Sequence, residues 1–491
     1  MFESAEIGHK IDKTRFKREE PKIRQRLLDL QYKLLENGKF PVIILVNGVD
    51  GAGKGETVNL FNEWMDPRHI HTHAFGGITD VERDRPEMWR FWQAMPPKGR
   101  IGILFGSWYT DPILRRVMGH EKRARFEQRL GRIRSFERML VAEGGVLLKL
   151  WFHLSKKAQK KRLKDLSSSK KTAWRVTKED WAHFEHYDEF IDVCEDALRE
   201  TSTGEASWEV IEGSDNGYRS LTAGRLLEDA LATRLKEGMP VLSPPAPPPE
   251  PPIDGRTLLA SFDYKRSLDR KDYSKRLVKL QAKLAMLTRS KKMRGRSLVM
   301  VFEGMDAAGK GSTIRRFTQA MDARFYRLIP VAAPTDEERA QPYLWRFWRH
   351  IPGHGRAVIF DRSWYGRVLV ERVEKFCSEF DWMRAYSEIN EFEEQLTEAG
   401  GIVAKFWLAI TPEEQLRRFK ARQNTPYKRF KITAEDWRNR KKWPAYERAV
   451  NDMVERTSTD PAPWTVIASD DKLFARIETL ERLCERIEAS F

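Results

Sequence analysis

Short apolar runs recur along the chain, and each is followed by glycine-rich or charged residues and then by a stretch with helical spacing. The clearest runs lie at residues 42–46, 298–302, 357–360 and 402–410. Their lengths and the turn residues that bound them predict β-strands. Because helical stretches separate these strands, the pattern predicts an α/β fold in which helices cover both faces of a parallel sheet.

The whole pattern occurs twice, with a constant offset of 256 residues. The sequence W-R-F-W at residues 89–92 recurs at 345–348, and S-W-Y at 107–109 recurs at 363–365. Between the copies, residues 240–252 are mostly proline, which favours an extended polyproline II spacer. We therefore predict two tandem domains with the same backbone fold, at residues 1–239 and 256–491, joined by a linker at residues 240–255.

Each copy contains a phosphate-binding loop after its first strand. The loops read G-V-D-G-A-G-K-G at residues 48–55 and G-M-D-A-A-G-K-G at 304–311. In a G-x-x-x-x-G-K loop, backbone N–H groups and the helix N-terminus surround a phosphate, and the lysine contacts its outer oxygens. In the second copy the predicted phosphate-binding residues are Gly304, Ala308, Gly309, Lys310, Gly311 and Ser312.

The residue after the loop lysine is Gly55 or Gly311, whereas ordinary nucleotide-hydrolysing loops have a serine or threonine that binds Mg²⁺. A metal would need other oxygen ligands, and the aspartate inside each loop, Asp50 or Asp306, can supply them. In the second copy, Asp361 directly follows an apolar strand, the usual position of a Mg²⁺-binding carboxylate. The alternative is that Asp361 only caps the following turn.

These residues predict phosphoryl transfer in the second copy. Asp306 and Asp361 would hold Mg²⁺, while Lys310, Arg362 and the metal neutralise charge on the transferred group. Ligands in parallel α/β sheets bind at the carboxyl ends of the strands, where both loops lie.

A basic segment after residue 410 is interpreted as a lid over a phosphate chain. The alternative is a solvent-facing basic helix. The predicted phosphate-binding cations in and near this site are Arg367, Arg418, Arg422, Lys428 and Arg429.

The first copy lacks most of these groups, so we expect it to be catalytically weak or silent. It retains Asp50 and Lys54, but Phe105 replaces Asp361 and Gly106 replaces Arg362. It has Asp111 in place of Arg367, and at the lid positions it has Leu166, Thr172 and Ala173 in place of Arg422, Lys428 and Arg429.

Composition adds a constraint on the partner. The 491 residues carry a formal net charge of +16, which favours a polyanionic partner such as nucleic acid, an anionic membrane surface or an inorganic polyanion. The alternative is a solvated basic surface that only aids solubility. The phosphate-binding loops favour a phosphate chain. No run approaches the roughly 18 apolar residues of a membrane span, and the polar N-terminus does not resemble a signal peptide, so we expect a cytoplasmic protein. The three cysteines offer no disulfide framework.

The second phosphate-binding loop, the sequence D-R-S-W-Y at residues 361–365, the basic lid and the late T-S-T at 457–459 together resemble the polyphosphate kinase 2 family. The two-copy arrangement is similar to the polyphosphate:AMP phosphotransferase branch of that family. The resemblance implies tandem P-loop kinase domains similar to thymidylate kinase, and transfer of a phosphoryl group from inorganic polyphosphate to AMP, giving ADP, with Mg²⁺ as cofactor. It carries Asp306, Lys310, Asp361 and Arg362 over as catalytic residues.

The resemblance implies polyphosphate and AMP or ADP as partners, no nucleic acid and no membrane, and leaves a homo-oligomer open. Alternative functions are a polyphosphate-dependent nucleoside diphosphate kinase, an ATP-dependent nucleoside monophosphate kinase, or a polyanion-binding protein without catalysis.

Overall fold

The computed structural model describes residues 1–238, 242 and 257–491, without the side chains of Lys428 and Lys431. The chain folds into two compact units. The first comprises Met1–Gly77, Arg90–Leu242 and Thr335–Trp345, and the second comprises Ile78–Trp89, Ser243–Pro334 and Arg346–Phe491. Apart from Leu242, the predicted linker at residues 240–255 lies outside the described residues.

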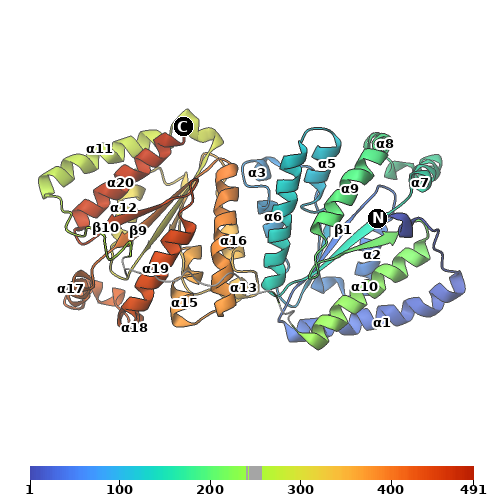
Figure 1. Cartoon of the computed structure of the whole chain (residues 1–491), viewed down its shortest axis with the longest axis horizontal. Helices are drawn as coiled ribbons and strands as arrows, with labels where there is room; N and C mark the ends of the chain where they lie inside the picture. The colour runs from blue at the N-terminus through green and yellow to red at the C-terminus, as the bar shows by residue number, and fades with distance from the viewer. Residues whose placement is uncertain (239–241, 243–256) are drawn as a thin grey trace. The chain divides into compact units, whose positions relative to one another are not determined.

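Each unit contains one five-stranded sheet in which all pairs of neighbouring strands are parallel (Figure 1). In the first unit the strand order is β2-β3-β1-β4-β5, and in the second it is β7-β8-β6-β9-β10, which is the same topology. The strands of the first unit are β1 (Val42–Gly48), β2 (Ile70–Ala74), β3 (Ile101–Phe105), β4 (Val146–His153) and β5 (Trp208–Glu212). Those of the second are β6 (Ser297–Gly304), β7 (Tyr326–Pro330), β8 (Ala357–Asp361), β9 (Gly401–Ala409) and β10 (Trp464–Ala468).

Helices cover both faces of each sheet, which confirms the predicted fold class. The helices in the first half of the chain are α1 (Lys13–Asn37), α2 (Lys54–Trp64), α3 (Asp80–Arg83), α4 (Trp89–Gln93), α5 (Thr110–Val117), α6 (Arg123–Ala142), α7 (Lys156–Ser168), α8 (Lys178–Glu185), α9 (Tyr187–Thr201) and α10 (Asn216–Glu237). Those in the second half are α11 (Arg270–Thr288), α12 (Lys310–Thr318), α13 (Asp336–Arg339), α14 (Trp345–Trp348), α15 (Val370–Glu374), α16 (Glu379–Glu398), α17 (Pro412–Gln423), α18 (Ala434–Lys441), α19 (Trp443–Thr457) and α20 (Lys472–Ala489). None of the helices in these described parts is long and apolar enough to cross a membrane.

The apolar runs form central strands because both of their faces are buried. In β1, Val42, Ile44 and Val46 belong to one apolar cluster with side chains of α1, α2 and α10, while Ile43 and Leu45 between them are buried outside that cluster. α1 and α10 lie side by side over the first sheet, and α11 and α20 do the same over the second (Figure 1). This packing fixes the central strands, so the loops at their carboxyl ends have a rigid base.

Candidate active site

The phosphate-binding loop of the second unit joins β6 to α12. Gly304 and Gly309 have φ angles of +151° and +114°. A Cβ atom on Gly304 would lie 2.7 Å from the carbonyl oxygen of Leu408, so the approach to β9 requires glycine. Because α12 begins at Lys310, the free N–H groups of its first turn belong to the loop. Lys310 Nζ donates to the Gly304 carbonyl at 2.6 Å, which holds the ammonium group beside the loop.

The remaining predicted loop residues leave the site open. A Cβ atom on Gly311 would meet nothing within 4 Å. Ser312 donates its hydroxyl to the Gly309 carbonyl at 2.9 Å.

The turn after β8 brings two more predicted residues to the loop. Phe302 of β6 pairs in register with Asp361 of β8, which places Asp361 beside the end of the strand that leads into the loop. Arg362 Nη2 donates to Asp306 Oδ1 at 3.1 Å, and Asn439 Nδ2 of α18 donates to Asp306 Oδ2 at 3.0 Å. The structure therefore brings together Asp306, Lys310, Asp361 and Arg362.

Arg362 has a left-handed backbone, with a φ angle of +65°. Such a conformation is costly for a residue other than glycine and is tolerated where the surrounding structure enforces it, often at functional sites. The turn aims the guanidinium group at Asp306 despite this cost.

Sequence reasoning missed a third carboxylate, that of Glu303. It lies at the end of β6, is 5% exposed, and accepts a hydrogen bond from Ser363 Oγ at 2.8 Å. Burial raises the pKa of Glu303, although Lys310 and the Ser363 hydroxyl oppose the rise. A signal was available in the repeat, because the first unit has Asn47 at this position and Asn47 Nδ2 donates to Ser107 Oγ at 2.8 Å.

Charge balance at the site favours an additional cation. Three carboxylates, on Glu303, Asp306 and Asp361, interact with the cationic side chains of Lys310 and Arg362. Burial lowers the pKa of Lys310, and the neighbouring Arg362 adds to this effect. These carboxylates would repel a phosphate chain unless a metal ion joined them.

The donor set fits Mg²⁺. Among the described residues, no three His, Cys, Asp or Glu side chains are grouped so that they could hold a metal without other ligands. Mg²⁺ does not need such a cage, because it usually takes one or two protein carboxylates and completes its shell with water and substrate phosphate oxygens. Asp306 and Asp361 are the two carboxylates that could hold it.

The structure turns Arg418, one of the predicted phosphate-binding cations, toward protein atoms. Arg418 is 3% exposed, and its five N–H groups donate to protein atoms. The acceptors are the carbonyl oxygens of Ala307, Ala308, Ser469 and Asp470 and the carboxylate of Glu414. Arg418 has no donor left for a phosphate, so it instead holds the loop backbone against the segment that follows β10.

The other predicted cations lie on three short segments. Arg367 is in the turn η5 (Trp364–Arg367) and forms an ion pair with Glu371 at 3.0 Å. Arg422 is half-buried near the end of α17. The exposed Arg429 lies in the turn η6 (Pro426–Lys431), where its Nε donates to the carbonyl of Gln423 at 3.0 Å. Lys428 is in the same turn, but its side chain lies outside the described atoms.

A buried network anchors the turn that carries Asp361 and Arg362. Lys405 of β9 and Glu393 of α16 form a fully buried ion pair at 2.7 Å. Glu393 also accepts from Trp364 Nε1 at 3.0 Å and from Tyr365 OH at 2.7 Å, and Lys405 donates to the Thr457 carbonyl at 2.7 Å. The first unit repeats the network with Trp108, Tyr109, Glu137, Lys149 and Thr201.

The equivalent site of the first unit has a different charge balance. Lys54 Nζ donates to the Gly48 carbonyl at 2.6 Å, as in the second unit, but it also pairs with Asp50 at 3.1 Å. His183 Nδ1 lies 3.1 Å from the other oxygen of Asp50. Burial would raise the pKa of Asp50, but Lys54 and His183 hold it below its usual range. The hydrogen bond to Asp50 raises the pKa of His183. One carboxylate here faces two basic side chains.

Comparison with known proteins gives the same domain organisation. The family described as polyphosphate kinase 2 matches residues 10–238 and 267–490. A polyphosphate:AMP phosphotransferase of Pseudomonas aeruginosa is 54% identical over 100% of this chain and 99% of its own. One of Acinetobacter johnsonii is 38% identical, over 94% and 95% of the two chains. A crystal structure assigned to a polyphosphate kinase 2 of P. aeruginosa PA01 superposes with a TM-score of 0.91 at 52% identity, over 100% and 99% of the two chains. With two matched domains and full-length relatives, this chain belongs to the polyphosphate kinase 2 family.

Proposed function

We propose that the chain transfers a phosphoryl group from inorganic polyphosphate to AMP, forming ADP, and that the second unit performs the transfer with Mg²⁺. The observation that carries this proposal is the cluster of Glu303, Asp306, Lys310, Asp361 and Arg362 at the carboxyl ends of β6 and β8. The names of the full-length relatives support polyphosphate as the donor and AMP as the acceptor.

In the proposed reaction, an oxygen of the AMP phosphate forms a bond to the terminal phosphorus of polyphosphate. The bond from that phosphorus to its bridging oxygen breaks, and the electron pair remains on the shortened chain. Little covalent help from the protein is needed, so alignment and neutralisation of charge dominate. Lys310 and Arg362 neutralise charge on the transferred group. Mg²⁺, when bound by Asp306 and Asp361, supplies further positive charge to the phosphate oxygens.

The first unit is expected to contribute little turnover. It keeps the loop lysine, Lys54, but has Asn47, Phe105 and Gly106 where the second unit has Glu303, Asp361 and Arg362. It therefore lacks two of the three carboxylates and the arginine of the cluster.

A donor comparison tests the proposed function. The full chain is incubated with AMP and Mg²⁺, with either polyphosphate or ATP as the sole donor, and ADP formation is measured by chromatography with and without EDTA. We expect ADP with polyphosphate and its loss on adding EDTA. Turnover with ATP alone would identify a nucleoside monophosphate kinase. If ADP in place of AMP were the better acceptor, forming ATP, the chain would be a nucleoside diphosphate kinase.

A further inference from the structure

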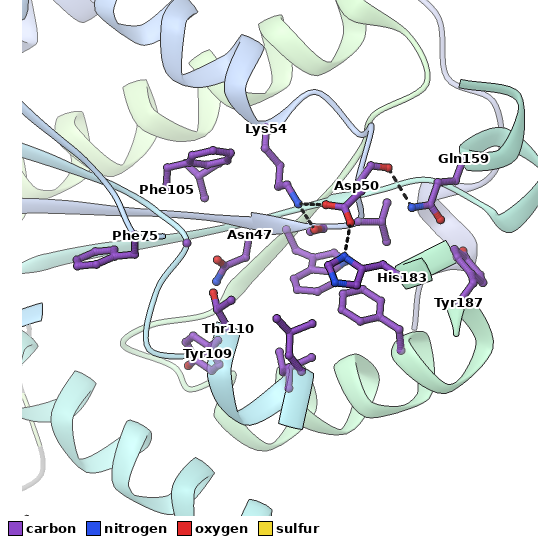
Figure 2. A pocket seen from close by; sticks show the side chains of 18 residues that line it. Asn47, Asp50, Lys54, Phe75, Phe105, Tyr109, Thr110, Gln159, His183 and Tyr187 are labelled. Carbon is purple, nitrogen blue, oxygen red and sulfur yellow. Dashed lines mark hydrogen bonds and ion pairs between the residues drawn. The ribbon is translucent and has the colours of Figure 1, made fainter. Parts of the chain in front are cut away.

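The first unit contains a cavity of 240 Å³ at the carboxyl ends of its strands (Figure 2). The equivalent cavity of the second unit measures 70 Å³. Asp50, Lys54 and His183 line one part of the larger cavity, and aromatic side chains such as Phe75 and Phe105 line another. The first unit, which lacks most of the catalytic charges, therefore has the larger cavity.

The phosphate-binding part of this cavity is retained. Gly48, Gly51 and Gly53 all have positive φ angles, and α2 begins at Lys54, so the loop and the helix N-terminus match those of the second unit. Lys54 Nζ has the same 2.6 Å hydrogen bond to the loop as Lys310. Since Asp50 is offset by both Lys54 and His183, the site can accept an anion without a metal ion.

The two cavities share a nonpolar wall, which indicates that both bind the same kind of ligand. It is formed in the first unit by Ile113, Leu114, Trp151, Tyr187 and Phe190, and at the same positions in the second by Leu369, Val370, Trp407, Trp443 and Tyr446. The wall residues differ in identity but stay largely nonpolar, whereas Asn47, Phe105 and Gly106 replace charged residues at the positions of the transfer chemistry. An aromatic wall beside a phosphate-binding loop suits a ligand with a planar ring and a phosphate end.

Two buried polar groups on the cavity wall have no hydrogen-bond partner among the residues that the structure describes. Trp151 is 2% exposed and its Nε1 donor is unpaired; Gln159 is 3% exposed and its Oε1 acceptor is unpaired. The Gln159 amide is held in place because its Nε2 donates to the Asp50 carbonyl at 3.1 Å (Figure 2). Buried polar groups are normally satisfied, so a ligand that offers both an acceptor and a donor would complete this wall. The heteroaromatic ring of a nucleobase offers both.

We propose that the first unit binds a nucleoside monophosphate as a ligand that does not react. The phosphate lies on the loop of residues 48–55 and Lys54, and the nucleoside lies against the aromatic wall that contains Trp151. This site rests on the proposed function, because it takes the wall that the two units share as the place where AMP binds in the second unit. The chain then carries one reacting and one non-reacting nucleotide site.

Binding stoichiometry tests the proposal. Isothermal titration of the full chain with AMP, without Mg²⁺ and polyphosphate, should show two sites per chain. Lys54→Met and Lys310→Met should each leave one site, and the double variant should leave none. A single site in the wild type that disappears with Lys310→Met and persists with Lys54→Met would overturn the proposal.

A second variant guards against loss of folding. Leu114→Trp fills the cavity from α5 without touching the loop, so it should also remove one site while circular dichroism stays like that of the wild type. In Lys310→Met, adenosine and inorganic phosphate should each bind at least about tenfold more weakly than AMP. Phosphate binding as tight as that of AMP would overturn the nucleoside part of the proposal. Turnover of polyphosphate and AMP is measured on the same preparation to separate this proposal from the proposed function. If only the first-unit site is wrong, the wild type still forms ADP.

Discussion

Glu303, Asp361 and Arg362 stand at positions where the first unit has Asn47, Phe105 and Gly106. Both units keep a hydrogen bond between the first of these positions and a serine of the turn. Ser363 donates to Glu303, and Asn47 donates to Ser107, both at 2.8 Å. The exchange therefore changes charge and leaves the local geometry in place. Single substitutions at these positions report on chemistry more than on folding.

Asp361→Asn should reduce kcat by at least about 100-fold, because it removes one of the two carboxylates proposed to hold Mg²⁺, and with the metal the positive charge that offsets the transferred group. The melting temperature should stay near that of the wild type, since Asp361 is only half-buried. Steady-state kinetics with polyphosphate and AMP measure the effect. Asp336→Asn on the exposed helix α13 is the matched control and should have wild-type kinetics. Near-normal turnover of Asp361→Asn would remove Asp361 from the mechanism.

Glu303→Gln should make stability less dependent on pH. Because burial raises the pKa of Glu303 in the folded state, the folded state binds its proton more tightly than the unfolded chain does. Glu303 then costs the wild type stability as the pH rises from its ordinary value of 4.5 to the raised pKa. The variant should gain free energy of unfolding relative to the wild type across this window, by up to about 1.4 kcal/mol per pH unit. Urea unfolding at several pH values measures this gain, and a difference that shrinks with rising pH would contradict it.

At the scale of elements, side chains of α16 and β9 anchor the turn after β8. The ion pair of Lys405 and Glu393 is fully buried, and both aromatic residues of the turn donate to Glu393. The first unit keeps the same network although it lacks the catalytic charges. We therefore infer that the network sets the path of the turn.

Lys405→Met should destabilise the second unit by about 3–5 kcal/mol, since it leaves Glu393 buried without its partner. It should also lower kcat by up to about 100-fold, because Asp361 and Arg362 would shift out of alignment. Lys149→Met in the first unit is the matched variant: it should cost similar stability but have a much smaller effect on kcat. Denaturation monitored together with turnover tests both parts, and equal losses of kcat in the two variants would show that the network does not act through the turn.

The sequence was sufficient for the central strands and for the position of Asp361 next to the phosphate-binding loop. The apolar runs gave the central strands, and the end of one run placed Asp361 beside the loop, because parallel strands end at one edge of the sheet. Glu303 was missed because it continues an apolar strand, and only the pairing of β6 with β8 brings Ser363 to it. The contacts of Arg418 could not be predicted because the direction of a helical side chain depends on distant residues, here Ser469 and Asp470, that the local sequence does not reveal.

At the scale of the whole molecule, the net charge of +16 provides long-range attraction for a polyanion. Such attraction acts mainly on substrate capture and weakens as salt screens it. Exposed cations of the second unit, such as Arg429, would add local contacts to this general field.

Arg429→Gln should raise the KM for long polyphosphate and make that KM less dependent on salt. Each cation that contacts a polyanion contributes about 0.7 to 0.9 to the slope of log affinity against log salt concentration, so the slope should fall by about that amount. Kinetics between low and high salt measure it. Lys170→Gln, on an exposed segment of the first unit, should leave the slope unchanged. A wild-type slope in Arg429→Gln would show that this turn does not contact the chain.

The left-handed turn after β8 has a further consequence for how the two units relate in evolution. Gly106 has a φ angle of +75°, close to the +65° of Arg362, and a Cβ atom there would have no contact shorter than 3.4 Å. The first unit therefore has the same left-handed turn that carries Arg362 in the second unit, and glycine adopts this conformation without strain. Asn47→Glu, Phe105→Asp and Gly106→Arg would therefore give the first unit the charges of the second on a turn with a similar backbone conformation.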